Sequence, residues 1–254
     1  MTPACGIGRQ LDGAAATGAG DSPRPIAAPD AALFLDAPFV AGDTPGPKIY
    51  FFKNRRFASW DVQEERPDPG YPRDIATAWP GLLEAGEGRA LRGALHVPGW
   101  GRTAYFLFEA DPLAVGWDLD RGTVLAERVP LRTIFPGGFE AGDFTPVYAQ
   151  QADGTRVIYA FQGHDYARWQ AGAAFPAAPD AGFPRKIAPD WKDGLVLAPR
   201  AGVYVEWPNR STAHSNRKIY FFMGDLYLRW DVPSNTRNYR LDVVAGWKGW
   251  PDFG

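Results

Sequence analysis

Four short runs of β-branched, aromatic and other apolar residues recur along the chain at a nearly constant interval. The runs are KIYFF ending at Phe52, TAYFLF ending at Phe108, VIYAF ending at Phe161 and KIYFF ending at Phe222. Their tyrosines are separated by 55, 54 and 61 residues, at Tyr50, Tyr105, Tyr159 and Tyr220. An unbroken apolar run of this length predicts a strand buried on both faces, so the chain repeats one strand-rich unit four times.

Each apolar run is the middle of a small antiparallel sheet. In the first unit a turn at 53–55 follows the run, and Phe57–Trp60 then alternates in character, as a half-buried partner strand does. A strand rich in small residues precedes the run by the same distance in the first and fourth units, at Pro29–Phe34 and Pro199–Tyr204. The corresponding strands of the second and third units are expected at Arg92–Leu95 and Phe144–Val147.

Two further aromatic positions keep step with the tyrosines. A tryptophan follows each tyrosine by ten residues, or by twelve in the second unit, at Trp60, Trp117, Trp169 and Trp230. We expect Trp60, Trp169 and Trp230 to be buried and structural. Another aromatic residue follows each tyrosine by about thirty residues, at Trp79, Phe135, Trp191 and Trp250. We expect each of these to come after a short helix or turn and to be buried between neighbouring units.

Four strand-rich units of this length predict an all-β fold, a four-bladed β-propeller with short helices at the blade edges. The small residues belong on the innermost strand of each blade, where bulky side chains would collide. The blades are expected at about 29–88, 89–142, 143–198 and 199–254. Residues 1–28 are mostly alanine, glycine, proline and small polar residues, which predicts a flexible tail.

Composition and charge narrow the function classes. The chain has 254 residues, of which 45% are hydrophobic and 14% aromatic, enough for a sizeable core. A net charge of −2 gives no sign of nucleic-acid binding or of binding to an anionic membrane, and the chain has no apolar stretch of spanning length. Cys5 is the only cysteine, so no disulfide can form within the chain. With no signal-peptide pattern, we expect a cytoplasmic protein, and secretion stays an alternative.

The repeat resembles that of the hemopexin family. The matching motifs are Asp30-Ala31-Ala32-Leu33-Phe34, Tyr50-Phe51-Phe52-Lys53-Asn54, Tyr227-Leu228-Arg229-Trp230-Asp231, Trp79-Pro80 and Trp250-Pro251. In overall plan the chain is most similar to stand-alone four-bladed members such as the plant seed albumins. It departs from the family in lacking a disulfide between the first and last blades. It also replaces the opening aspartate of later repeats with Arg92, Phe144 and Arg200.

The resemblance implies a cation, calcium or sodium, held in the axial channel by main-chain carbonyls. The matching positions are Ala31, Gly93, Thr145 and Ala201, with a deeper ring at Ile49, Ala104, Ile158 and Ile219. Four carbonyls and water would suit a hard cation. The alternative is that small residues occur there only because four blades converge.

The resemblance also raises polyamine or haem as ligands. Haem binding is expected to be weak, because His96, His164 and His214 are the only histidines and none lies in a haem-ligating pattern. Other candidate ligand-binding residues are two tryptophan–arginine loops and two arginines at opening positions: Trp100, Arg102, Trp207, Arg210, Arg92 and Arg200. For the tryptophans, a structural role capping the end of a blade is an alternative.

No catalytic motif is present: the sequence has no nucleophile elbow, phosphate-binding loop, zinc-protease motif or dinucleotide fingerprint. The sequence therefore favours a non-catalytic binding module that presents its axial channel and loops to an ion, a small molecule or a protein. An enzyme of a specialised natural-product pathway, with its active site at the propeller mouth, is the alternative. The sequence does not identify the partner, and a homodimer is left open.

Overall fold

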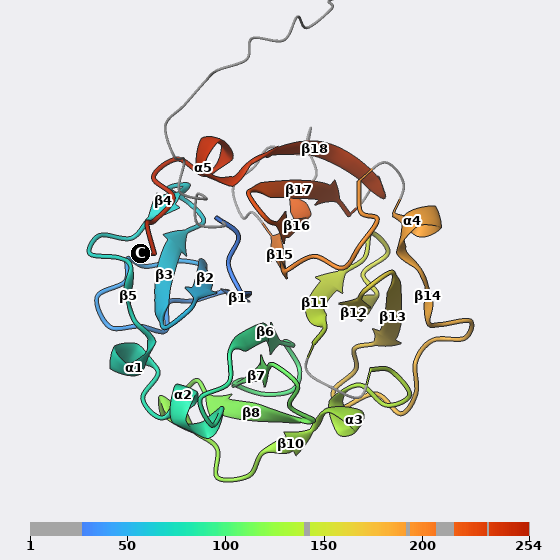
Figure 1. Cartoon of the computed structure of the whole chain (residues 1–254), viewed down its shortest axis with the longest axis horizontal. Coiled ribbons are helices and arrows are strands. Elements are labelled where there is room, and N and C mark those ends of the chain that lie inside the picture. Colours follow the sequence, from blue (N-terminus) through green and yellow to red (C-terminus); the bar gives the residue numbers. More distant parts are fainter. Residues whose placement is uncertain (1–26, 140–142, 192–193, 207–215, 233, 254) are drawn as a thin grey trace, which may run out of the picture.

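Four antiparallel sheets stand around a common axis in the computed structural model, which describes residues 27–139, 143–191, 194–206, 216–232 and 234–253 (Figure 1). The four-bladed propeller predicted from the repeat is confirmed. The innermost strands β1, β6, β11 and β15 lie against one another around the axis in chain order, and β15 closes the ring against β1. No helix among the described residues is long and apolar enough to cross a membrane.

The blades share one strand order. Blade 1 consists of β1 (Ala31–Leu35), β2 (Lys48–Lys53), β3 (Arg56–Asp61), β4 (Arg66–Pro67) and β5 (Arg73–Asp74). Blade 2 consists of β6 (Leu91–His96), β7 (Thr103–Phe108), β8 (Leu113–Asp118), β9 (Thr123–Val124) and β10 (Val129–Pro130). Blade 3 consists of β11 (Thr145–Gln150), β12 (Arg156–Gln162), β13 (Asp165–Gln170) and β14 (Arg185–Lys186). Blade 4 consists of β15 (Ala201–Glu206), β16 (Arg217–Met223), β17 (Leu226–Asp231) and β18 (Thr236–Asp242).

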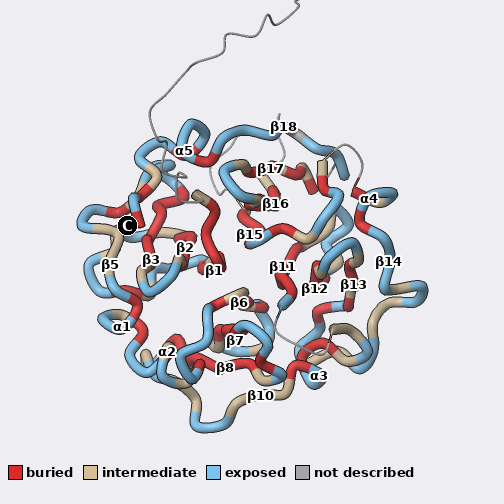
Figure 2. Tube along the Cα trace, viewed as in Figure 1, coloured by how far each residue is buried: buried red, intermediate tan, exposed pale blue. Residues whose placement is uncertain are grey.

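The core lies between adjacent blades, and burial decreases from the inner strands to the rim (Figure 2). The tryptophans predicted to be structural lie on third strands and are at most 3% exposed, at Trp60, Trp169 and Trp230, and so is Trp117 on the third strand of blade 2. Each pairs with a buried residue of the second strand, at Ile49, Ala104, Ile158 and Ile219. The deeper channel ring predicted at these four residues is therefore wrong, because they lie one strand away from the axis.

A short helix precedes one buried aromatic residue in every blade. The helices are α1 (Ile75–Ala78), α3 (Leu131–Ile134), α4 (Ile187–Asp190) and α5 (Val243–Gly246), with α2 (Leu82–Ala85) an extra turn in blade 1. The aromatic residue donates its backbone N–H to the first residue of the helix at 2.7–2.9 Å, and the four are Trp79, Phe135, Trp191 and Trp247. The prediction that Trp250 is the closing aromatic residue of the last blade is therefore wrong by three residues. The Trp-Pro dipeptide that suggested Trp250 lies beyond this closing turn and is only half-buried.

Polar contacts close the ring between the last and first blades. Arg200 of blade 4 donates through Nε to Oδ1 of Asp30 at 2.8 Å. Ala28 donates its N–H to the carbonyl of Gly224 at 2.8 Å, and Ala27 donates to Asp225 Oδ1 at 2.9 Å. These two alanines are the only described residues of the segment for which a tail was predicted, since 1–26 lie outside the description.

Candidate functional site

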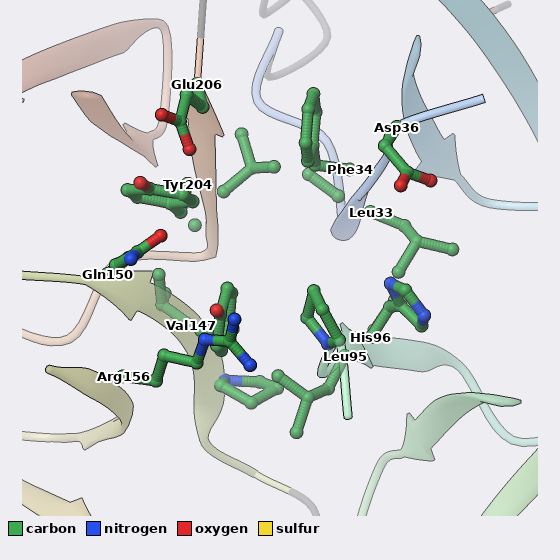
Figure 3. Close-up of a pocket in the computed structure, with 17 residues that line it drawn as sticks. Leu33, Phe34, Asp36, Leu95, His96, Val147, Gln150, Arg156, Tyr204 and Glu206 are labelled. Carbon is green, nitrogen blue, oxygen red and sulfur yellow. The ribbon is translucent and has the colours of Figure 1, made fainter. Parts of the chain in front are cut away.

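An axial cavity of about 220 Å³ opens where the four innermost strands end (Figure 3). The second strands fix its register, because Phe34, His96, Tyr148 and Tyr204 pair with equivalent residues of β2, β7, β12 and β16. Each blade therefore contributes one of these four side chains at the same level. The next level outward is formed by Asp36, Pro98, Gln150 and Glu206. Below both, the cavity floor consists of Ala32, Ala94, Pro146 and Gly202.

The small floor residues reflect how closely the blades approach. A Cβ added at Gly202 would lie 2.5 Å from Val147 Cγ2, and one added at Gly93 would lie 2.6 Å from Pro146 Cδ. A larger residue at either position would push neighbouring inner strands apart. The aromatic level lies two residues further along each inner strand. Tyr148 and Tyr204 meet there edge to face, with ring centroids 5.9 Å apart.

Two charged groups of the mouth are unpaired. Glu206 accepts from Arg217 Nε at 3.4 Å. Neither Asp36 nor Arg156 has a hydrogen-bonding or ion-pair partner among the described residues. Figure 3 shows these two side chains on opposite sides of the cavity, Asp36 beyond β1 and Arg156 on β12. The mouth therefore presents one unpaired carboxylate and one unpaired guanidinium across an aromatic-lined space, beside the paired carboxylate of Glu206.

Burial shifts the pKa values of three other titratable groups of the cavity. Burial lowers the pKa of His96, although the nearby Asp36 carboxylate acts in the opposite direction. Burial raises the pKa of both Tyr148 and Tyr204. The Tyr204 hydroxyl is buried and makes no hydrogen bond of good geometry with the described residues, although the backbone of Gln150 lies near it.

The opposite end of the axis contains the positions predicted to hold a cation. Ala31, Gly93, Thr145 and Ala201 pair with Phe52, Leu107, Phe161 and Phe222, each of which lies two residues after the repeat tyrosine. The register predicted for the two central blades is therefore correct. Thr145 donates its hydroxyl to the carbonyl of Pro199 at 2.6 Å. Among the described residues no three His, Cys, Asp or Glu side chains gather as a metal site would need.

A groove of about 580 Å³ at this end brings together the two arginines predicted from the opening positions. Arg92 donates to Glu109 at 2.7 Å, and Arg200 is bonded to Asp30. Both therefore already have acidic partners. They lie at the end of the axis opposite to the cavity mouth, so they cannot act on the same small ligand as Asp36.

The predicted tryptophan–arginine loops are only partly described. Trp100 is half-buried, donates through Nε1 to the carbonyl of Ala174 at 3.0 Å and lies 4.7 Å from the ring of Phe175. These contacts join blade 2 to blade 3 and favour the structural alternative for this residue. Arg102 forms an exposed ion pair with Asp120. Trp207, Arg210 and His214 lie outside the described residues.

Sequence reasoning missed the residues of the axial cavity. His96 was considered only as a haem ligand, and Phe34, Asp36 and Glu206 were not proposed for any site. The signal was present, because Phe34, His96, Tyr148 and Tyr204 each follow a predicted carbonyl position by three residues. It could not be used without knowing which inner-strand residues a twisted blade turns toward the axis.

Comparison with known proteins agrees with this architecture. The hemopexin family model matches residues 36–82, within blade 1. A hemopexin-fold protein from cow pea superposes with a TM-score of 0.62 at 16% identity, over 87% of this chain and 96% of its own. A seed albumin from Lathyrus sativus gives 0.60 at 16% identity, over 88% and 96%. A plant lectin with two metal binding sites from Cicer arietinum gives 0.60 at 14% identity, over 87% and 95%.

The chain thus has the four-bladed β-propeller fold of these hemopexin-fold proteins, and the hemopexin family model matches part of its first blade. No curated protein sequence matches it. At 14–16% identity the similarity to the plant proteins establishes the fold alone.

Proposed function

We propose that this protein is a non-catalytic binding module whose axial cavity holds a small zwitterion, with an ammonium group at Asp36 and a carboxylate at Arg156. The observation that carries the proposal is the pair of unpaired opposite charges on facing walls of the cavity. Between them, Phe34, Tyr148 and Tyr204 offer aromatic faces and edges to an aliphatic chain and to the ammonium group.

The cavity chemistry favours a zwitterion over the two ligands that the family resemblance implies. A polyamine would bring a second ammonium toward Arg156, and the two like charges would repel each other. Haem is disfavoured because pockets for drug-sized ligands begin at about 300 Å³, and this one is about 220 Å³. An ω-amino acid of about six carbons suits both the volume and the charge pattern.

A cation at the opposite end of the axis is a second part of this proposal. The inner-strand residues at that end, which are in equivalent register, are Ala31, Gly93, Thr145 and Ala201. None of them is larger than threonine, so their backbone carbonyls can approach a common point. The fold-related Cicer arietinum lectin is described as having two metal binding sites, which supports a cation in this fold. Calcium or sodium would be held by backbone oxygen, with no acidic side chain required.

Isothermal titration calorimetry with 6-aminohexanoate tests the zwitterion proposal. Hexylamine and hexanoate, which each keep one charge, should bind more weakly, and so should spermidine. Asp36→Asn should weaken the binding of 6-aminohexanoate and hexylamine but not that of hexanoate. Arg156→Gln should weaken the binding of 6-aminohexanoate and hexanoate but not that of hexylamine. Glu64→Gln and Arg121→Gln, at exposed residues outside the cavity, serve as matched controls. Equal binding of all four ligands, or losses in the control variants, would contradict the proposal.

An enzyme is a second candidate, and it rests on one observation. His96 lies in the cavity within electrostatic reach of Asp36, and its lowered pKa leaves a neutral imidazole able to accept a proton. Prolonged incubation of a bound ligand with the protein, followed by mass spectrometry, separates the two. An unchanged ligand supports the binding module, whereas conversion that His96→Gln abolishes supports the enzyme.

A further inference from the structure

The connection between the first two strands of blade 1 covers the blade's aromatic core. Residues 36–47 form this connection, and the ring of Phe39 lies 4.6 Å from that of Trp79 and 6.1 Å from that of Trp117 in the next blade. The Tyr50 hydroxyl accepts the N–H of Phe39 at 2.8 Å and donates to Asp43 Oδ2 at 2.7 Å. One ring and one carboxylate of the connection therefore complete the surroundings of Tyr50.

Blade 3 lacks this cover among the described residues. Its connection is shorter, at residues 151–155, and brings no aromatic side chain over Tyr159. Tyr166 and Trp191, the equivalents of Phe57 and Trp79, are 5% and 6% exposed, whereas the blade 1 residues are fully buried. A groove of about 660 Å³ lies there, between blade 3 and Val232 and Asn235 of blade 4.

Blade 2 shows that the cover is the usual arrangement. Its equivalent tyrosine, Tyr105, lies 6.1 Å from the ring of Trp100 and 5.7 Å from that of Phe175. In blades 1 and 2 an aromatic ring from the chain itself thus occupies the place above the repeat tyrosine. The corresponding connection of blade 4 falls outside the described residues.

The Tyr159 hydroxyl also lacks a carboxylate acceptor of the kind that Asp43 provides for Tyr50. It accepts from Gln151 Nε2 at 2.9 Å and interacts with Arg168, but no acceptor among the described residues receives its proton. Arg185 occupies the position of Arg73 and also lines the groove, where its guanidinium forms a long ion pair with Asp190 at 3.8 Å.

The acidic side chains near the groove do not replace Asp43. Asp190 accepts from the Tyr166 hydroxyl at 2.7 Å, and Asp180 accepts from Arg168 Nε at 2.6 Å, so both are committed to other donors. Asp153 accepts from the backbone N–H of Thr155 within its own turn.

We propose that this groove of blade 3 binds a small aromatic carboxylic acid. The ring of the ligand lies in the place that Phe39 fills in blade 1, against Trp191. Its carboxylate accepts the proton of the Tyr159 hydroxyl, as Asp43 accepts that of Tyr50, and lies beside Arg168 and Arg185. The ligand thus supplies in blade 3 the two groups that the chain supplies for itself in blade 1.

Calorimetric titration of the full chain with 3-phenylpropionate tests the proposal. We expect one site per chain, and weaker binding of the neutral 3-phenylpropanamide and of propionate, which lacks the ring. Tyr159→Phe keeps the ring but removes the hydroxyl, and should weaken 3-phenylpropionate about tenfold or more. Tyr105→Phe makes the same change in the covered site of blade 2 and should leave binding unchanged.

A second pair of variants tests the place of the ring without touching the core. Ala152 is exposed in the connection that borders the groove, and Ala152→Phe should fill the groove and abolish binding. Ala177→Phe adds the same ring at another exposed loop of blade 3 and should have no effect. Arg185→Gln should weaken binding, and Arg185→Lys should restore part of it.

Failure of 3-phenylpropionate to bind at millimolar concentration would overturn the proposal, as would binding that Tyr159→Phe and Ala152→Phe leave intact. The axial variant Arg156→Gln should not alter this binding. The proposal for the groove and the proposal for the axial cavity can therefore be refuted independently of each other.

Discussion

Replacing Trp247 with alanine should destabilise the junction between the last and first blades more than the same change at Trp250. Trp247 is 4% exposed, and its ring lies 4.8 Å from Trp60 and 5.3 Å from Phe51, both in blade 1. Truncation of a buried tryptophan costs about 3–5 kcal/mol. At about 2–4 °C per kcal/mol for a domain of this size, the melting temperature should fall by roughly 6–20 °C.

Trp250 provides the matched control. It is half-buried, and its ring lies 4.8 Å from Phe51 and 6.0 Å from Phe222 at the edge of the same cluster. Its truncation should cost about 1–2 kcal/mol. Thermal and urea unfolding followed by circular dichroism measure both variants. A larger loss for Trp250→Ala than for Trp247→Ala would refute the assignment of Trp247 as the closing aromatic of blade 4.

Three further results are expected. Lys48 is fully buried, with its Nζ 2.6 Å from Asp61 and 3.3 Å from Asp68. Lys48→Met should therefore lower the free energy of unfolding by about 3–5 kcal/mol, measured by urea titration, because it leaves two buried carboxylates without their cation. A neutral effect would contradict this. Burial opposes the charge of Asp61, but hydrogen bonds from Lys48 and Thr44 lower its pKa to about 2. The Asp61 carboxylate should therefore stabilise the fold fully above pH 4, and this contribution should be lost as the pH falls toward 2. In acid unfolding, Asp61→Asn should abolish this part of the pH dependence. A chelator should lower the melting temperature if calcium occupies the axial carbonyls, and Ala201→Leu should remove that response; an unchanged melting temperature with chelator and with added sodium would count against the cation.

The repeat could be predicted from the sequence because every blade packs against its neighbours and around the axis in the same way. The apolar second strand, the tryptophan of the third strand and the small residues of the inner strand recur at fixed offsets. These offsets were enough to align Gly93 and Thr145 correctly, although β6 has an irregular register near Gly93. The closing aromatic of blade 4 was misplaced because two tryptophans, Trp247 and Trp250, lie three residues apart, and only the hydrogen bond to Val243 distinguishes them.

The candidate sites could be predicted less well, because they depend on differences between blades. The charges of Asp36 and Arg156 matter only because they face each other across the axis, and they are 120 positions apart in the chain. The groove of blade 3 exists because residues 151–155 contain no aromatic residue that could lie over Tyr159. The lack of an aromatic residue in this connection is visible in the sequence, but what it leaves uncovered is visible only in the fold.

A crystal structure of the protein with 6-aminohexanoate tests the central claim most directly. The account predicts density for one ligand in the axial cavity, with its ammonium group within hydrogen-bonding distance of Asp36 and its carboxylate at Arg156. The chain of the ligand should lie along Phe34, Tyr148 and Tyr204. A cavity that holds only ordered water, in crystals grown at ligand concentrations that saturate binding in solution, would contradict it.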